Sequence, residues 1–108
     1  MPVTDLQFAM LTGLAAGPRH GYSLLKEAES QLGRRVAVAT AYACFEVMIT
    51  RGWIRSDGEE EIRGRTRRYY VLSGSGREVL ATRASELAAR IRLAQDRLFG
   101  MAGKATTA

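Results

Sequence analysis

Four arginines lie close together near the middle of the chain: Arg63, Arg65, Arg67 and Arg68 fall within six residues, beside Gly64. A guanidinium pairs with a phosphate through two parallel N–H donors, a geometry that lysine lacks. The neighbouring glycine lets the backbone approach a partner closely. We interpret the cluster as a phosphate-binding or minor-groove-binding group. The alternative is a solvated hairpin edge, with the preceding acidic run neutralising part of the charge.

Four further candidates flank the predicted start of a helix at 40–51. Arg34 and Arg35 precede this helix, and they either contact phosphates or solvate a loop, two interpretations that the sequence leaves open. Thr40 and Tyr42 lie in its first turn, where hydroxyls and backbone N–H groups meet phosphates or bases. We expect Tyr42 to face a nucleic acid, with a core position of its ring as the alternative.

The remaining chemically distinctive residues favour structural roles. His20 is the single histidine and has no second metal ligand or nucleophile at a suitable spacing, so we expect it to help start a helix. Cys44 lies mid-helix among apolar neighbours, where a thiol is more often core filler than a redox sensor. Tyr22 and Trp53 are expected in the core, with a phosphate contact by Tyr22 and ligand stacking by Trp53 as the alternatives. We predict no enzymatic activity, no metal and no cofactor.

The composition favours a polyanionic partner. The 108 residues carry 16 Lys+Arg against 11 Asp+Glu, a formal charge of +5, and 14 of the 16 basic residues are Arg. A coding bias toward Arg is the alternative. The length suits one domain. Neither a membrane-spanning run nor a secretory signal is evident, and the lone cysteine excludes an intrachain disulfide, so we expect a cytoplasmic location and no membrane partner.

Apolar periodicity predicts three helices in the first half of the chain. The segment Thr4–Gln7 matches a capping box and opens the first helix, which Gly17-Pro18 ends. The second helix starts near His20-Gly21 and runs to about Leu32, with Gly33 as its C-terminal glycine. The third spans roughly 40–51.

From residue 53 the pattern changes toward a period of two, which is typical of strands. We predict short strands at 53–56 and 67–72, the second rich in residues that suit a half-buried sheet. Asp57-Gly58 is a turn signal, and 59–66 is expected to be a polar loop. The two strands then form a β-hairpin wing.

A long helix, capped by Ser73 or Ser75, is predicted to run to about Phe99. Its apolar residues are spaced by 4, 3, 4, 3 and 4, which is typical of a coiled-coil seam. The seam residues are Leu80, Ala84, Leu87, Ile91, Ala94 and Leu98. This helix is longer than a three-helix core can cover, so we expect it to form a homodimer interface.

The predicted order of elements defines the fold class: α+β, mostly α, a winged helix-turn-helix with three helices, a two-stranded β wing and a long C-terminal dimerisation helix. We assign 1–75 to the DNA-binding domain, 76–99 to the dimerisation helix and 100–108 to a disordered tail. In such domains the third helix enters the major groove and the wing lies along the backbone.

The stretch from Leu11 to Leu80 resembles the PadR family of bacterial transcriptional regulators. Four motifs carry the resemblance in order: Gly17–Tyr22, Ala39–Tyr42, Arg51–Ile54, and Arg63–Ser73 with its trailing Gly76. The length resembles the short branch of the family, in which one C-terminal helix serves for dimerisation. The resemblance implies homodimers, repression of target promoters and, in some members, release by small phenolic or aromatic ligands.

The chain departs from the family pattern in the third predicted helix. Ala41 and Ala43 flank Tyr42, and Val47 stands where the family often has a basic residue. Base readout needs donors and acceptors, so specificity here would depend on DNA shape or methyl contacts. We predict a sequence-specific regulator of double-stranded DNA, a homodimeric repressor on a pseudo-palindromic operator, with a small aromatic or hydrophobic effector. The alternative is a winged-helix protein–protein interaction module.

Overall fold

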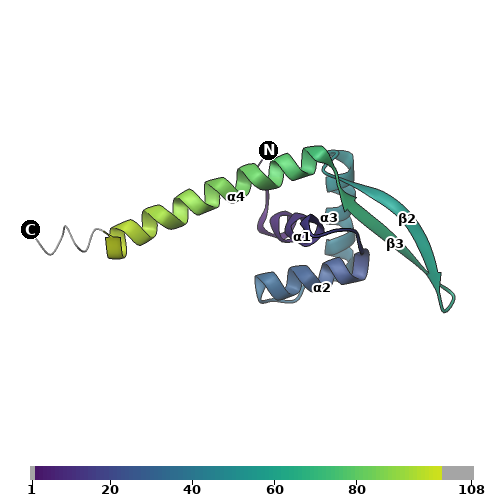
Figure 1. Cartoon of the computed structure of the whole chain (residues 1–108). Coiled ribbons are helices and arrows are strands. Elements are labelled where there is room, and N and C mark those ends of the chain that lie inside the picture. Colours follow the sequence, from purple (N-terminus) through teal and green to yellow (C-terminus); the bar gives the residue numbers. More distant parts are fainter. Residues whose placement is uncertain (1, 101–108) are drawn as a thin grey trace, which may run out of the picture.

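The computed structural model describes residues 2–100 and confirms the winged helix-turn-helix architecture (Figure 1). Three helices surround one end of a twisted antiparallel sheet, and a long helix extends away from both. The elements are α1 (Asp5–Ala15), β1 (Arg19–His20), α2 (Gly21–Leu32), α3 (Val38–Thr50), β2 (Ile54–Ile62), β3 (Arg65–Leu72), α4 (Gly74–Gln95) and a π-helical turn, η1 (Asp96–Gly100).

Side-chain caps determine where most of the helices begin. The Thr4 hydroxyl and the Gln7 side chain exchange hydrogen bonds with each other's backbone N–H groups, so the predicted capping box is confirmed. Ser73, and not Ser75, caps α4, accepting a hydrogen bond from the Gly76 N–H. In contrast, α3 follows Ala37, which has no capping side chain, and it begins at Val38, before the predicted start at residue 40.

The core lies where α1, α2, α3 and the base of the sheet meet. Phe45 of α3 and Tyr70 of β3 form its centre, with ring centroids 4.9 Å apart. Trp53 is buried at the junction of α3 and β2, as predicted. The other fully buried apolar residues include Met10, Leu11, Leu14, Leu24, Met48 and Ile54. Burial of such side chains contributes ~1.5–3 kcal/mol each, and this holds the helices on the sheet.

The wing is longer than predicted. The segment expected to be a polar loop, 59–66, lies mostly in β2 and β3, and the turn is at Arg63-Gly64, whose φ angles are 52° and 76°. Two successive positive φ angles are typical of a two-residue hairpin turn. Asp57-Gly58 is a bulge and not a turn, because the register with β3 shifts between Ser56 and Glu59. The outer parts of β2 and β3 are exposed on both faces, so their charged residues show no alternation of apolar and polar side chains from which a strand could be predicted.

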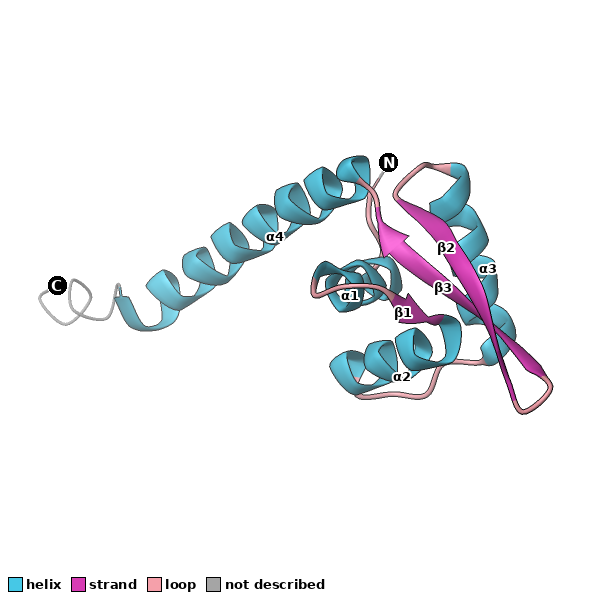
Figure 2. Cartoon of the chain, turned by 45° about the vertical axis from the view of Figure 1, so that its right-hand side comes forward, coloured by secondary structure: helices cyan, strands magenta, loops and turns pink. Residues whose placement is uncertain are grey.

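A third strand was missed by the sequence analysis. Arg19 and His20 form β1, which pairs antiparallel with Tyr69 and Tyr70 and gives the sheet the order β1-β3-β2 (Figure 2). Two residues are too few for a detectable period. The short strand ties the start of α2 to the wing, and so it positions the site described below.

The last helix projects from the rest of the molecule (Figure 1). Its first turns pack on the core through Val79 and Leu80. The predicted end at Phe99 is one residue early, because Gly100 belongs to the final turn; the rest of the predicted tail, 101–108, lies outside the described residues. No helix in the described part of the chain is both long and apolar enough to cross a membrane.

Candidate nucleic-acid interface

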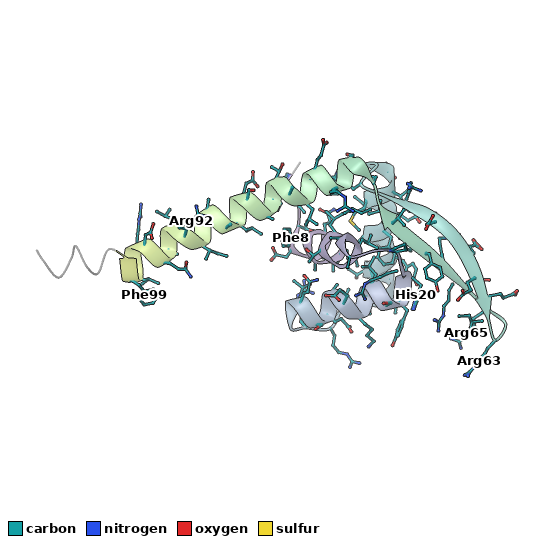
Figure 3. The ribbon with its side chains drawn as sticks, viewed as in Figure 1. Phe8, His20, Arg63, Arg65, Arg92 and Phe99 are labelled. Carbon is teal, nitrogen blue, oxygen red and sulfur yellow. The ribbon has the colours of Figure 1, made fainter. Side chains whose placement is uncertain are left out.

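Three elements meet at a polar hollow of about 410 Å³. The start of α2, the first half of α3 and the outer half of β3 supply its walls. Figure 3 shows His20 at the start of α2 and Arg65 on the wing, with Arg63 at the wing tip. The lining residues are His20, Gly21, Tyr22, Tyr42, Arg65, Thr66, Arg67 and Arg68.

The wing arginines differ in their partners. Arg68 Nη2 lies 3.5 Å from Glu59 Oε1, directly across the hairpin, and Arg67 is opposite Glu60 in the register. Among residues 2–100, Arg63, Arg65 and Arg67 form no ion pair. The acidic strand thus neutralises part of the cluster, and the outer part keeps unpaired guanidinium groups available for anions.

Tyr42 joins the hollow to the core. Its side chain is 41% exposed, while its ring meets Phe45 edge-on at 5.0 Å between centroids. The hydroxyl lies against Gly21, where an added Cβ would come within 2.7 Å of it. One edge of the ring therefore packs inside, in line with the core alternative, and the hydroxyl reaches the hollow; the contact of Tyr42 with a nucleic acid stays a prediction.

His20 has the structural role that the sequence predicted, and it also lines the hollow. His20 caps α2, because its Nδ1 accepts a hydrogen bond of 3.3 Å from the Ser23 backbone N–H. Its Nε2 is 3.4 Å from Arg67 Nη1. Burial and then the nearby Arg67 lower the pKa of His20 below its ordinary value of 6.5. A neutral imidazole accepts at only one nitrogen, so capping α2 and accepting from Arg67 exclude each other.

Tyr22 was predicted to be in the core, and this prediction is wrong. The side chain is 57% exposed, and the Lys26 ammonium lies 5.4 Å from the centre of its ring. The helical period gives only a weak signal of the error, because Tyr22 lies three residues before Leu25, at the edge of the inward stripe of α2. Gly21 and Thr66, also in the lining, carried no such signal.

Four predicted residues lie outside this hollow, and one of them is Arg63 in the turn of the wing. Arg34 and Arg35 are exposed on the loop between α2 and α3, and in the described part of the chain neither forms an ion pair. Thr40 is exposed in the first turn of α3. The first backbone N–H groups of α3 have no side-chain cap, because Ala37 at the N-cap position supplies none. The positive end of the helix dipole is therefore open to an anion.

The outward face of α3 is largely apolar. Val38 and Val47 are exposed, and Glu46 is the only charged residue between Val38 and Thr50. Cys44 lies toward the inner side, where burial raises the pKa of its thiol to about 11. The same helix that borders a cationic hollow thus presents methyl groups to solvent.

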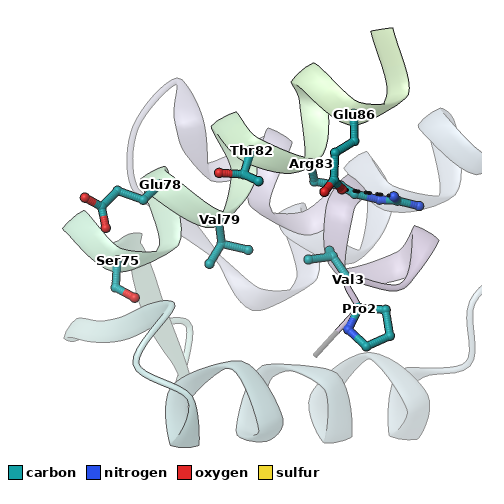
Figure 4. A pocket seen from close by; sticks show the side chains of 8 residues that line it. All are labelled: Pro2, Val3, Ser75, Glu78, Val79, Thr82, Arg83 and Glu86. Carbon is teal, nitrogen blue, oxygen red and sulfur yellow. Dashed lines mark hydrogen bonds and ion pairs between the residues drawn. The ribbon is translucent and has the colours of Figure 1, made fainter. Parts of the chain in front are cut away.

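A second hollow, of about 440 Å³, lies between the N-terminal segment and α4 (Figure 4). Its lining mixes Val3 and Val79 with the carboxylate of Glu78 and with an Arg83–Glu86 ion pair of 3.3 Å. The buried Arg83 Nε has no hydrogen-bond partner among the described residues. Within residues 2–100 no cluster of three or more His, Cys, Asp or Glu side chains could hold a metal ion.

Solved structures share this fold. The smu.1704 protein of Streptococcus mutans superposes with a TM-score of 0.73 and 22% identity, covering 93% of each chain. A PadR family transcription regulator from Clostridium difficile superposes with a TM-score of 0.71 and 20% identity, and the match covers 88% of this chain and 98% of that one. RosR from H. salinarum superposes with a TM-score of 0.67 and 19% identity, and the match covers 96% of this chain and 94% of that one.

Comparison with curated protein sequences yields no match. The family model described as "Transcriptional regulator PadR-like family" matches residues 10–82, which include α2, α3, the whole wing and the first turns of α4. The architecture and this match agree with the resemblance carried by the four sequence motifs. The chain belongs to the PadR-like family of transcriptional regulators.

Proposed function

We propose that this protein is a homodimeric transcriptional repressor that binds a pseudo-palindromic operator in double-stranded DNA. One observation carries the proposal: three arginines of β3 line a hollow together with Tyr42, which lies one turn after the uncapped N-terminus of α3. Cationic side chains and free N–H groups that converge on one surface suit a phosphate backbone, because each neutralised phosphate releases a condensed counterion.

The two elements would divide the work of recognition. The first turns of α3 enter the major groove, with Thr40 and the backbone N–H groups on the flanking phosphates, and Arg34 and Arg35 close to the same strand. The wing places Arg63, Arg65, Arg67 and Arg68 on the backbone or in the adjacent minor groove. Contacts to phosphate position the protein, and contacts to base edges select the sequence.

The exposed seam of α4 supports the homodimer. Ile91 is 57% exposed, and Leu98 is more exposed still, on a helical segment that extends away from its own core. Packing the seam against a second copy buries these side chains. A two-fold axis would then set two recognition helices about 34 Å apart, one turn of DNA, and occupation of a promoter there blocks transcription in the cytoplasm.

Release by a small effector is part of the proposal. The hollow between the N-terminal segment and α4 adjoins the helix that would set the angle between protomers, so a ligand there could shift the two recognition helices out of register (Figure 4). Its charged lining favours a ligand with polar groups over the purely aromatic or hydrophobic one expected from the sequence.

A protein-binding module is the second candidate, favoured by the apolar outward face of α3. Binding to the protein's own promoter region, measured across a salt series, separates the two. DNA binding at dimer stoichiometry should weaken steeply with salt, whereas docking to a protein does not release condensed counterions.

A pair of arginine variants makes this experiment sharper. Arg65→Ala should weaken binding and reduce the salt slope by about 1, as expected for one lost phosphate contact. Arg77→Ala removes the same charge from an exposed site at the start of α4 and should leave the slope unchanged. Failure to bind DNA above weak background at low salt would overturn the repressor proposal and direct attention to a protein partner.

A further inference from the structure

The outward face of α3 holds a continuous apolar stripe. Ala39, Ala43 and Val47 follow one another at intervals of four residues, so they lie on successive turns of one side of the helix. All three are exposed, and Val47 is 41% exposed. Lys, Arg, Asn and Gln are absent from the whole of α3, Val38–Thr50. The stripe therefore has nothing with which to donate a hydrogen bond to a base.

Only one group in the major groove matches such a stripe. Each base pair presents donors and acceptors there, and thymine alone adds an apolar group, its C5-methyl. The carboxylate of Glu46, on the same outward side, is repelled by the N7 and O6 acceptors of guanine and accepts from the exocyclic amino groups of cytosine or adenine. The stripe therefore favours A·T pairs whose thymine methyl faces α3, and Glu46 favours an adenine or cytosine amino group on the strand that it faces.

We infer that α3 recognises its half-site mainly through thymine methyl groups packed against Ala39, Ala43 and Val47. The inference rests on the function proposed above and specifies the chemistry of the sequence that the protein selects. Charge supports DNA over a protein as the occupant of this face. The adjoining hollow carries three arginines, and the N-terminus of α3 is uncapped, so both borders of the stripe attract polyanions.

The test starts from a random duplex pool, from which the full-length protein selects its preferred site. That site is then made twice, once with thymine and once with uracil, which pairs identically and lacks the C5-methyl. Loss of each buried methyl should weaken binding roughly fourfold, the equivalent of one methylene group removed from an apolar contact. The salt slope should stay the same, because the phosphate contacts are unchanged.

Two matched truncations assign the effect to the stripe. Val47→Ala should reduce the ratio of the affinities for the thymine and uracil sites toward one, at a single position of the half-site. Val38→Ala removes the same two methyl groups from an exposed residue of α3 that lies off the stripe, and it should keep the full preference. Both residues are exposed, so neither change should unfold the domain.

Three other outcomes of these experiments would each refute a different claim. Equal affinity for the thymine and uracil sites, with sequence selection intact, would refute methyl readout and leave the repressor proposal standing. Thymine preference that survives equally in both variants would assign the methyl effect to DNA shape and refute the role of the stripe. Failure to select any sequence at low salt would refute the repressor proposal and the inference together.

Discussion

At a single residue, Gly76, the backbone approach is closer than at any other described glycine. An ideal Cβ at this position would lie 1.9 Å from the Trp53 carbonyl oxygen, so the first turn of α4 touches the backbone at the base of the hairpin. Ser73 reinforces the contact, since its hydroxyl is 2.9 Å from the same oxygen. A side chain here must move backbone, because its two closest neighbours would be the carbonyl oxygen and carbon of Trp53.

Gly76→Ala should therefore lower the free energy of unfolding by about 3 kcal/mol, the upper part of the range for overpacked sites. Gly74→Ala, two residues earlier in the same turn, is the control, because nothing lies within 4 Å of its added Cβ. Urea unfolding of the two variants measures the difference. Equal stabilities would contradict the close approach of α4 to Trp53.

Cys44 illustrates how burial decides reactivity at a single residue. Burial raises the pKa of its thiol from 9.0 to about 11, so the thiolate population at neutral pH is ~100-fold smaller than that of an ordinary cysteine. The thiolate is the species that oxidants attack. The residue thus suits the role of core filler that its apolar neighbours predicted, and a redox-sensing role has no support from its surroundings.

At the element scale, the pH dependence of stability should reflect the start of α2. The pKa of His20 is lower in the folded protein than its ordinary value of 6.5, so the unfolded chain binds the proton more readily. The stabilisation is then present above about pH 6.5 and is lost as the pH falls below it. Protonation removes the acceptor for the Ser23 N–H and adds a charge beside Arg67.

His20→Asn tests this prediction. The asparagine oxygen is a good helix cap and does not titrate, so stability at pH 7.5 should stay within about 1 kcal/mol of the parent. Between pH 7 and 5.5 the parent should lose stability and the variant should lose less, as followed by the melting temperature. Parallel curves for the two proteins would show that His20 does not control this range.

The wing shows how an element can form from charged residues. Glu59 and Glu60 lie directly opposite Arg68 and Arg67, and opposite charges across a strand pair contribute about 0.2–1 kcal/mol, at the low end for exposed groups. The Tyr69 hydroxyl adds a hydrogen bond to Glu60 Oε1 at 3.2 Å. The acidic strand is thus a structural partner of the arginines and holds them in an extended row.

At the scale of the whole molecule, α4 should decide the oligomeric state. Ile91→Asp places a charge in the middle of the proposed seam and should convert the dimer to a monomer at micromolar concentration, as measured by analytical ultracentrifugation. DNA binding should weaken with it, because a monomer contacts only one half-site. The monomer fold should survive, since Ile91 is exposed in the single chain.

Ala89→Asp is the matched control for this experiment. It introduces the same carboxylate two residues earlier, on the opposite side of the helix, where the residue is also exposed. The variant should remain dimeric and bind DNA as the parent does. Dissociation by both substitutions, or by neither, would show that the seam is not the interface.

Local sequence patterns were enough to predict the helices and the class of fold. The capping box at Thr4, the glycine at 33 and the stepped apolar residues of α4 act over a few neighbouring residues, so their effects can be predicted without knowing the rest of the molecule. The motifs spread from Gly17 to Gly76 identified the family for the same reason. The arginine cluster was also evident, because charge is a property of composition.

The way in which these parts form a site depends on contacts between distant residues of the folded chain. The pairing of β1 with β3 and the contact of Tyr42 with Gly21 join residues that lie more than 20 positions apart, and the hairpin register pairs residues as distant as Ile54 and Leu72. Such contacts depend on loop closure and on packing around Phe45, and no local pattern encodes them. The hollow, the place of His20 in it and the partners of each arginine follow from those contacts, because a site is a property of the whole packed chain.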